Sequence, residues 1–230
     1  IILAGCSGSQ NKGASAAGAP AGERTEPLKL KIGGLGSGRE DDVQSYPISK
    51  FIEEVKTRSN GKILIEHFPD GQLGGEPDMM DQVLSDTLDF GCLSTNVLAT
   101  VWPELYVYNL PFAFPTLKDF WTTCGMDSTE FINAISSAVD NTEKAKFISS
   151  FSAEFRGCQN TKHEIRSPKD FKGLTFRVMA GEIFTDIFRA LGASTATVPF
   201  AELYTSLQQG VVDGEDIGIS MFYVQKLYEV

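Results

Sequence analysis

The chain has 230 residues, a formal net charge of −10 and a pI near 4.7, with 42% apolar and 22% charged residues. This composition predicts a packed fold of one large domain or two small ones, and it excludes a disordered chain. The acidity and the lack of Lys/Arg runs argue against a nucleic-acid partner, because that function needs a basic surface. An anion would have to bind at a local positive site, against a slightly repulsive overall field.

The first six residues, IILAGC, resemble the end of a hydrophobic signal segment followed by a bacterial lipoprotein cleavage box. In such lipoproteins the cysteine, here Cys6, is lipidated and becomes the first mature residue. The Gly, Ala and Ser after it predict a flexible tether. We expect 1–6 to be a signal-peptide remnant and 7–26 a tether, with a lipid as the only membrane anchor, at the outer face of the cell membrane or in the periplasm. The alternative is a chance apolar hexamer in a cytosolic protein.

The other three cysteines, Cys92, Cys124 and Cys158, are more than thirty residues apart and form no Cys-x-x-Cys pair. They lack metal-ligand spacing, and we expect small buried side chains, with one disulfide left open. The two histidines, His67 and His163, have no partner at helical spacing. A zinc site or a catalytic triad is therefore disfavoured, and we expect no cofactor.

Alternating apolar residues at 28–32 predict the first strand of the folded body. The glycine-rich run 33–38 fits neither a dinucleotide-binding nor a Walker-type loop, although a turn with backbone N–H groups near a ligand stays open. Helix and strand signals then alternate: a helix over 46–60, a strand over 62–68, a helix over 77–84 and a strand over 87–93. This order predicts an α/β sheet with parallel neighbours.

Ser94 lies just past the carboxyl end of the third predicted strand, where open α/β sheets bind ligands, although an ordinary helix cap explains it equally well. Thr116 begins a short helix with Asp119 as its capping partner. The remaining predicted elements are a helix over 129–139, a strand over 146–155, helices over 181–191 and 199–210, an acidic turn over 213–216 and a helix from 220.

The stretch 166–178 predicts a capped turn that ends at Gly173, followed by a strand. Leu174, Phe176 and Val178 share one face of that strand, and Arg177 lies on the other. Arginine presents a planar set of donors that matches a carboxylate. From these residues alone, a salt bridge on a solvated face is favoured over a ligand-binding group, because most arginines are exposed.

Four segments resemble those of TRAP transporter solute-binding proteins of the DctP type: FPDGQLGGE at 68–76, LPFAF at 110–114, PKDFKGLTFR at 168–177 and PFAELYTSLQQGVVDGE at 199–215. They follow the family's order and cover the chain from about residue 28 to its end. The resemblance implies an α/β, two-lobed periplasmic-binding-protein-like (type II) fold that closes on its ligand about a hinge. It implies lobe I over 27–152, lobe II over 153–217, an incomplete return toward lobe I over 218–230, and a chain truncated at both ends.

The resemblance also implies the site residues. Arg177 takes the place of the family's carboxylate-binding arginine, and Arg156 that of a second arginine before it. Asn160 falls where the family often has asparagine, and Ser94 in a loop that often lines the cleft.

The motif departs from the family at 215–217, which reads Glu-Asp-Ile. The family usually has Gln and then Glu at the first two positions and often a polar, ligand-facing residue at the third. Ile217 therefore predicts an apolar wall in the site.

The implied function is capture of a small organic acid and its delivery to integral membrane subunits of a TRAP-type secondary transporter, without catalysis. A ligand-sensing surface lipoprotein is the first alternative. A secreted enzyme acting on an organic acid is the second, for which the sequence offers no nucleophile elbow and no paired carboxylates.

Overall fold

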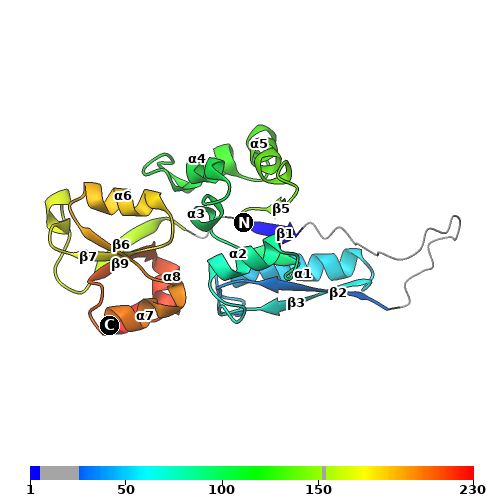
Figure 1. Cartoon of the computed structure of the whole chain (residues 1–230), viewed down its shortest axis with the longest axis horizontal. Helices are drawn as coiled ribbons and strands as arrows, with labels where there is room; N and C mark the ends of the chain where they lie inside the picture. Colours follow the sequence, from blue (N-terminus) through cyan, green and yellow to red (C-terminus); the bar gives the residue numbers. More distant parts are fainter. Residues whose placement is uncertain (6–25, 152–153) are drawn as a thin grey trace, which may run out of the picture.

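The structure, a computed structural model, describes residues 1–5, 26–151 and 154–230. It forms two α/β lobes that lie side by side along the long axis of the molecule (Figure 1). The first lobe holds a five-stranded sheet of order β3-β2-β4-β1-β5, and the second a four-stranded sheet of order β6-β9-β7-β8. The two-lobed α/β fold predicted above is therefore confirmed.

The strands of the first lobe are β1 (Ile2–Gly5), β2 (Leu28–Gly33), β3 (Ile63–Phe68), β4 (Phe90–Cys92) and β5 (Ala145–Ser149). Its helices are α1 (Ser45–Arg58), α2 (Glu76–Leu84), α3 (Thr95–Leu98), η1 (Pro103–Asn109), α4 (Leu117–Cys124) and α5 (Thr129–Asp140). Strand β2 pairs in parallel with β3 and β4, as the alternating order predicts. The predicted capping of α4 is confirmed, because Asp119 N donates to Thr116 Oγ1 at 3.1 Å.

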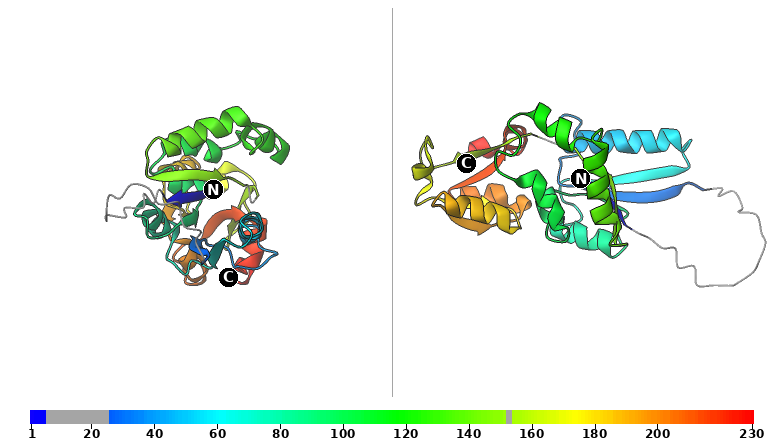
Figure 2. Two further views of the ribbon diagram at one scale, coloured as in Figure 1. Left: turned by 90° about the vertical axis from the view of Figure 1, so that its right-hand side faces the viewer. Right: turned by 90° about the horizontal axis from the view of Figure 1, so that it is seen from above.

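Helices cover both faces of the first sheet, and the side chains of β1 point alternately into the apolar cluster on each face. Ile2 packs with Ile32 of β2 and Ile48 of α1, whereas Leu3 packs with Met79 of α2 and residues of α3, η1 and α5. Successive strand residues point to opposite faces, so one short strand joins both apolar clusters. In the left view of Figure 2, α5 lies above β5 and β1.

The N-terminal segment, which the sequence predicts to be a signal-peptide remnant, pairs within the first sheet, and its removal stays a prediction. Ile2–Gly5 forms β1, antiparallel to β4 on one side and β5 on the other, and Ile2 and Leu3 are 2% and 0% exposed. An apolar run gains about 25 cal/mol for each Å² it removes from water, which favours this position in the sheet. Cys6 and residues 7–25 of the predicted tether lie outside the described residues.

The strands of the second lobe are β6 (Arg156–Asn160), β7 (Thr175–Val178), β8 (Ser194–Thr197) and β9 (Gly214–Gly218). Its helices are η2 (Pro168–Phe171), α6 (Glu182–Ala190), η3 (Phe200–Glu202), α7 (Leu203–Gln208), α8 (Ile219–Val224) and η4 (Leu227–Glu229). The acidic turn predicted over 213–216 is wrong, because β9 is an inner strand whose five residues are all buried. One of its two carboxylates, Asp216, forms an ion pair with Arg156 of the neighbouring strand.

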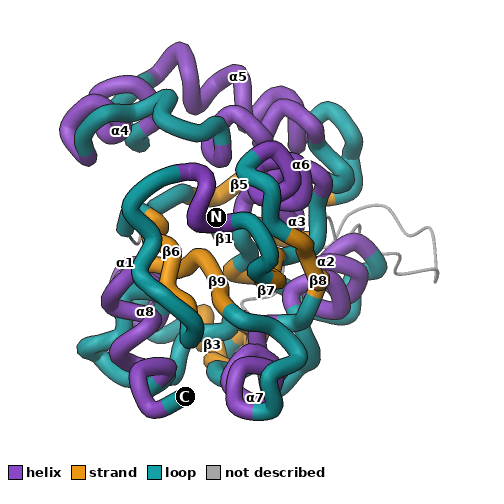
Figure 3. Tube along the Cα trace, turned by 90° about the vertical axis from the view of Figure 1, so that its left-hand side faces the viewer, coloured by secondary structure: helices purple, strands orange, loops and turns teal. Residues whose placement is uncertain are grey.

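Apolar clusters on the two faces of the second sheet orient Arg177. Phe176 stacks on Phe188 of α6 with ring centroids 4.5 Å apart, and Val178 belongs to the same cluster. On the other face, residues of α7 and α8 pack around Ile217. Figure 3 shows α6 on one side of β7 and β9 and α7 on the other. Arg177 lies on the α7 side, which confirms the predicted alternation of this strand.

The last thirteen residues pack on the second lobe. Met221 and Leu227 join the apolar cluster of α7, and Val43 of the first lobe packs against it. The incomplete return toward lobe I therefore stays a prediction.

Cys92 and Cys124 are buried as expected, Cys158 is exposed, and no disulfide joins these three. Within the described ranges, no helix is both long and apolar enough to cross a membrane.

Candidate functional site

Arg177 is a buried cation at the carboxyl end of β7. It is 2% exposed, its Nε donates to the carbonyl of Val198 at 2.8 Å, and its guanidinium carbon lies 6.0 Å from the centroid of the Phe200 ring. Burial, and then the charge of Arg156, lower the pKa of Arg177 to about 10, which still leaves it charged at neutral pH. Among the described residues it forms no ion pair, so its terminal nitrogens are available to an anion.

Arg156 lies on the opposite face of the same sheet and is already engaged. Its Nε donates to Asp216 Oδ2 at 2.6 Å, and a terminal nitrogen donates to the carbonyl of Asp216. The guanidinium also lies 4.9 Å from the centroid of the Phe184 ring, on the α6 side. Arg156 and Arg177 thus share one sheet, but only Arg177 keeps open donors.

Glu215 stands beside Arg177 in the sheet. The register pairs Gln159 of β6 with Glu215 of β9, and Glu215 with Arg177 of β7, so the three side chains form one row on the α7 face. Glu215 is 1% exposed, and its Oε2 is buried without a partner among the described residues. Burial, followed by the charge of Asp216, raises the pKa of Glu215 to about 8, although both arginines oppose this.

Ser94, the predicted lining residue of the first lobe, is held by Glu76 of α2. Its hydroxyl donates to Glu76 Oε2 at 2.5 Å, and its N–H donates to Oε1 at 2.7 Å. Burial raises the pKa of Glu76, and the two hydrogen bonds from Ser94 oppose the rise. The charge of Arg177, in the second lobe, also lowers the pKa of this carboxyl group. Ser94 therefore fixes the start of α3 and the approach of Glu76 to the second lobe.

Asn96, in the segment where the sequence predicts Ser94 as the lining residue, joins the two lobes. It is 1% exposed, and its Nδ2 donates at 2.9 Å to the carbonyl of Ala180, three residues after Arg177. The next residue, Gly181, has a φ of 117°, and a Cβ there would lie 3.5 Å from the Asn96 carbonyl oxygen and from the Tyr106 hydroxyl. The carboxyl end of β7 is thus held directly against α3.

Two predicted residues lie near Arg177 on different faces of the second sheet, Asn160 on the opposite face and Ile217 on the same one. Asn160 pairs with Gly214, one residue from the row of Gln159, Glu215 and Arg177, so its side chain lies on the opposite face of the sheet from Arg177. Its Oδ1 accepts hydrogen bonds from the N–H groups of Lys162 and His163 in a local turn. Ile217 is 6% exposed and lies inside the apolar cluster of α7 and α8. Their part in the site stays a prediction.

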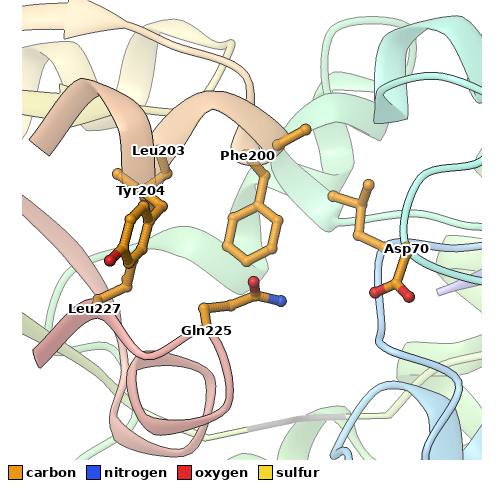
Figure 4. Close-up of a pocket in the computed structure, with 8 residues that line it drawn as sticks. Asp70, Phe200, Leu203, Tyr204, Gln225 and Leu227 are labelled. Atoms are coloured by element: carbon orange, nitrogen blue, oxygen red, sulfur yellow. The ribbon is translucent and has the colours of Figure 1, made fainter. Parts of the chain in front are cut away.

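A pocket of about 200 Å³ lies between the lobes next to Arg177. Leu35 and Asp70 line it from the first lobe, and the second lobe contributes Phe200, Ala201, Leu203, Tyr204, Gln225 and Leu227. In Figure 4 the Phe200 ring lies near the middle, with the Gln225 amide beside it and the Asp70 carboxylate across the space. Phe200 lines the pocket and also lies beside the Arg177 guanidinium, so the pocket is close to Arg177.

The glycine-rich run 33–38 folds over a side chain of its own lobe. Asp42 is 0% exposed and accepts hydrogen bonds from Ser37 N and Oγ, both at 3.0 Å, and from the N–H groups of Gln44 and Ser45. A Cβ on Gly36 would lie 2.8 Å from Asp42 Oδ1, so the close approach requires glycine. The run therefore supports the start of α1.

The solved structures most similar in fold include two TRAP periplasmic solute binding proteins. One, from Roseobacter denitrificans with bound L-galactonate, has a TM-score of 0.81 and 28% identity, covering 89% of this chain and 66% of that one. The other, from Sulfurospirillum deleyianum with bound succinate, has a TM-score of 0.80 and 27% identity, covering 89% and 64%.

Among curated relatives, the ectoine/5-hydroxyectoine-binding periplasmic protein UehA of Ruegeria pomeroyi is 29% identical over 189 residues, 82% of this chain and 55% of that protein. The chain spans about half the length of the curated relatives it matches, 49% to 56% for the first three. The family model of bacterial extracellular solute-binding proteins, family 7 (DctP), matches residues 37–230. Together with the two-lobed fold, this match shows that the chain belongs to that family of solute-binding proteins.

Proposed function

We propose that this protein captures a small organic acid between its two lobes and delivers it to the integral membrane subunits of a TRAP-type secondary transporter. Arg177 holds the ligand's carboxylate. The first lobe closes over it from α3, and the rest of the ligand extends past Phe200 toward the interlobe pocket.

The observation that carries this proposal is the buried Arg177 with open donors. Removing a guanidinium from water without a counter-charge costs several kcal/mol, so a fold does not bury one for stability. A carboxylate offers two oxygens in the geometry of the terminal nitrogens, and charge-assisted bonds of this kind are about twice as strong as neutral ones. Two interlobe features lie next to it, the bond from Asn96 to Ala180 and the pocket beside Phe200.

The site also suggests the class of ligand. Arg156 is neutralised by Asp216, which leaves Arg177 as the open cation described here. We therefore favour an acid that presents one carboxylate to the second lobe and places hydroxyl or apolar groups in the pocket.

Calorimetry of the purified protein against a panel of organic acids tests the proposal, with the Arg177→Ala variant alongside. Truncating one partner of a buried charge pair costs about 2–5 kcal/mol, so we expect affinity to fall by about thirtyfold or more. Arg189→Ala is the matched control, because Arg189 is an exposed arginine of the same lobe. Unchanged affinity in Arg177→Ala, with wild-type melting behaviour, would falsify the proposal.

We further propose that Cys6 carries the lipid that anchors the protein outside the cytoplasm. The basis is the IILAGC box. Processing ahead of Cys6 would remove β1, so mass spectrometry of protein from cell membranes tests both features together. We expect an acylated peptide that begins at Cys6 and a Cys6→Ser variant that is released from the membrane. An unacylated protein that retains residues 1–5 would contradict the anchor and keep β1 in the mature fold.

A further inference from the structure

Glu215 shares its row in the second sheet with the arginine of the proposed site. Neighbouring strands are about 4.8 Å apart, so the Glu215 carboxyl lies within reach of an anion held on Arg177. The register places it directly opposite Arg177 on the α7 face. It is also almost completely buried, at 1% exposure.

The two oxygens of Glu215 have different surroundings. With its amide oriented to satisfy its neighbours, Gln159 donates to Glu215 Oε1 at 2.8 Å and to the carbonyl of Gly157 at 2.9 Å. Oε2 has no partner among the described residues. A buried carboxylate oxygen without a donor is costly, whereas a carboxylic acid turns the same atom into an O–H donor that can serve an acceptor.

The charged and titratable groups around Glu215 come from its own strand and from both neighbouring strands: Asp216, Arg156, Cys158 and Arg177. The helices over this face carry Tyr204 on α7 and Tyr223 on α8, and Tyr223 is 70% exposed. From the first lobe, Glu76 acts on Arg177. Burial raises the pKa of Cys158 to about 11, and burial lowers that of Arg177 to about 10. Neither group therefore titrates near pH 8, where Glu215 does.

We propose that Glu215 is a second ligand-binding residue of the site, which acts as a neutral carboxylic acid and donates its O–H hydrogen bond to the carboxylate held by Arg177. This inference rests on the proposed function of Arg177. A neutral donor adds a third hydrogen bond to the ligand without repelling it. Once ionised, Glu215 repels the ligand's carboxylate and competes for the guanidinium, so the same residue limits binding to the pH range in which it keeps its proton.

The sign of the effect follows from the two carboxyl groups. The ligand is ionised above the ordinary carboxyl pKa of about 4, and Glu215 is neutral below its own raised pKa of about 8. Binding is therefore strongest between these values. Above the upper value, affinity falls by about tenfold for each pH unit, because one proton must be taken up for each ligand bound.

The experiment is calorimetry of the strongest ligand found in the acid panel, from about pH 6 to about pH 9.5, a range that spans the raised carboxyl pKa. We expect a flat affinity followed by the tenfold decline, and the uptake of one proton per ligand in buffers of different ionisation enthalpy at the alkaline end. Glu215→Gln keeps a neutral donor of the same size, so we expect near wild-type affinity at neutral pH and no decline above it.

Glu202→Gln is the matched control, since it removes an exposed carboxylate of the same lobe, and it should keep the wild-type pH profile. The inference is overturned if wild-type affinity is flat across the range or if Glu215→Gln retains the decline. Arg177→Ala separates the two proposals. If it keeps full affinity, the proposed function fails. If it loses affinity while Glu215→Gln leaves the pH profile unchanged, only the role of Glu215 fails.

Discussion

Each face of the second sheet carries one arginine and one acidic residue, but only on one face do the two form an ion pair. On the α6 face, Arg156 and Asp216 form an ion pair with a 2.6 Å contact, and the arginine side chain is 34% exposed. On the α7 face, Arg177 and Glu215 are adjacent in register and almost completely buried, at 2% and 1% exposure, without an ion pair within the described residues.

This difference distinguishes charged groups that stabilise the fold from charged groups that are available to a ligand. The Arg156–Asp216 pair satisfies itself and needs nothing from outside the fold. Arg177 and Glu215 bear the cost of burial without the attraction that would offset it, which a fold keeps only where another requirement acts. The face with unmatched groups is therefore where we propose that the ligand binds. Substitutions at four residues test this comparison, beginning with the largest expected effect.

Replacing the unmatched arginine by an apolar residue of similar length should abolish binding without harming the fold. In Arg177→Met we expect ligand affinity to fall by about thirtyfold or more, and the melting temperature without ligand to stay level or rise, because an uncompensated charge is removed. Calorimetry and thermal denaturation measure the two effects. A large loss of stability would show that Arg177 is structural and would reverse the contrast between the faces.

Breaking the matched pair should do the opposite. Asp216→Ala leaves Arg156 without its acceptor, and we expect a loss of about 1–3 kcal/mol in the free energy of unfolding, reduced from the fully buried case because Arg156 is partly exposed. Asp216→Asn keeps an acceptor oxygen and should lose less. Urea denaturation measures both, and equal stability of wild type and Asp216→Ala would remove the structural role.

Asp42 is a buried carboxylate whose hydrogen-bond acceptors are satisfied, and it can be compared with Glu215, whose Oε2 has no partner among the described residues. Burial raises its pKa, but the N–H groups of Ser37, Ser45 and Gln44 and the Ser37 hydroxyl together outweigh this, so the pKa lies below its ordinary value of 3.8. A carboxyl group whose pKa is lower in the folded state stabilises the fold. This stabilisation is complete at pH values above the unfolded-state pKa, and it is lost as the pH falls through the folded-state pKa.

We therefore expect Asp42→Asn to lose about 1–2 kcal/mol of unfolding free energy at neutral pH, because charge-assisted bonds become neutral ones. The gap between wild type and variant should narrow below about pH 4, where the unfolded-state carboxyl takes up its proton. Denaturation curves at a series of pH values measure it. A gap that is constant with pH would show that the carboxylate charge contributes nothing.

The smallest expected effect concerns the bond between the lobes. Asn96→Ala removes the donor to the Ala180 carbonyl, and one neutral hydrogen bond contributes about 1 kcal/mol, or roughly fivefold in ligand affinity. Asn141→Ala, on an exposed helix end of the first lobe, is the control. Affinity equal to wild type would mean that this bond is made both with and without ligand.

Local sequence pattern predicted much of this fold. The alternation around Arg177, the cap at Thr116 and the parallel order of β2, β3 and β4 all follow from short-range rules, and the structure confirms them. The capping box from Ser167 to Asp170 is confirmed as well. Such features depend on residues a few positions apart, which the sequence displays directly.

The rest depends on long-range pairing, which local rules do not see. The acidic run 213–216 has the composition of a turn, but pairing with β6 and β7 makes Gly214–Gly218 an inner strand. Asn160 matched a motif position, yet the register places its side chain on the opposite face of the sheet from Arg177. Neither Asn96 as an interlobe donor nor Glu215 as the neighbour of Arg177 is visible until register and lobe contact are known.

The unmatched charge of Arg177 has a consequence for any membrane subunit that receives this protein. An empty molecule that closes must seal a lone guanidinium away from water, at several kcal/mol, whereas a loaded one encloses a neutral pair. Each 1.4 kcal/mol of this cost of closure lowers the ratio of closed to open conformations in the ligand-free protein tenfold. A transporter that binds only the closed conformation would therefore rarely bind the ligand-free protein. Unproductive docking would be suppressed by the binding protein itself.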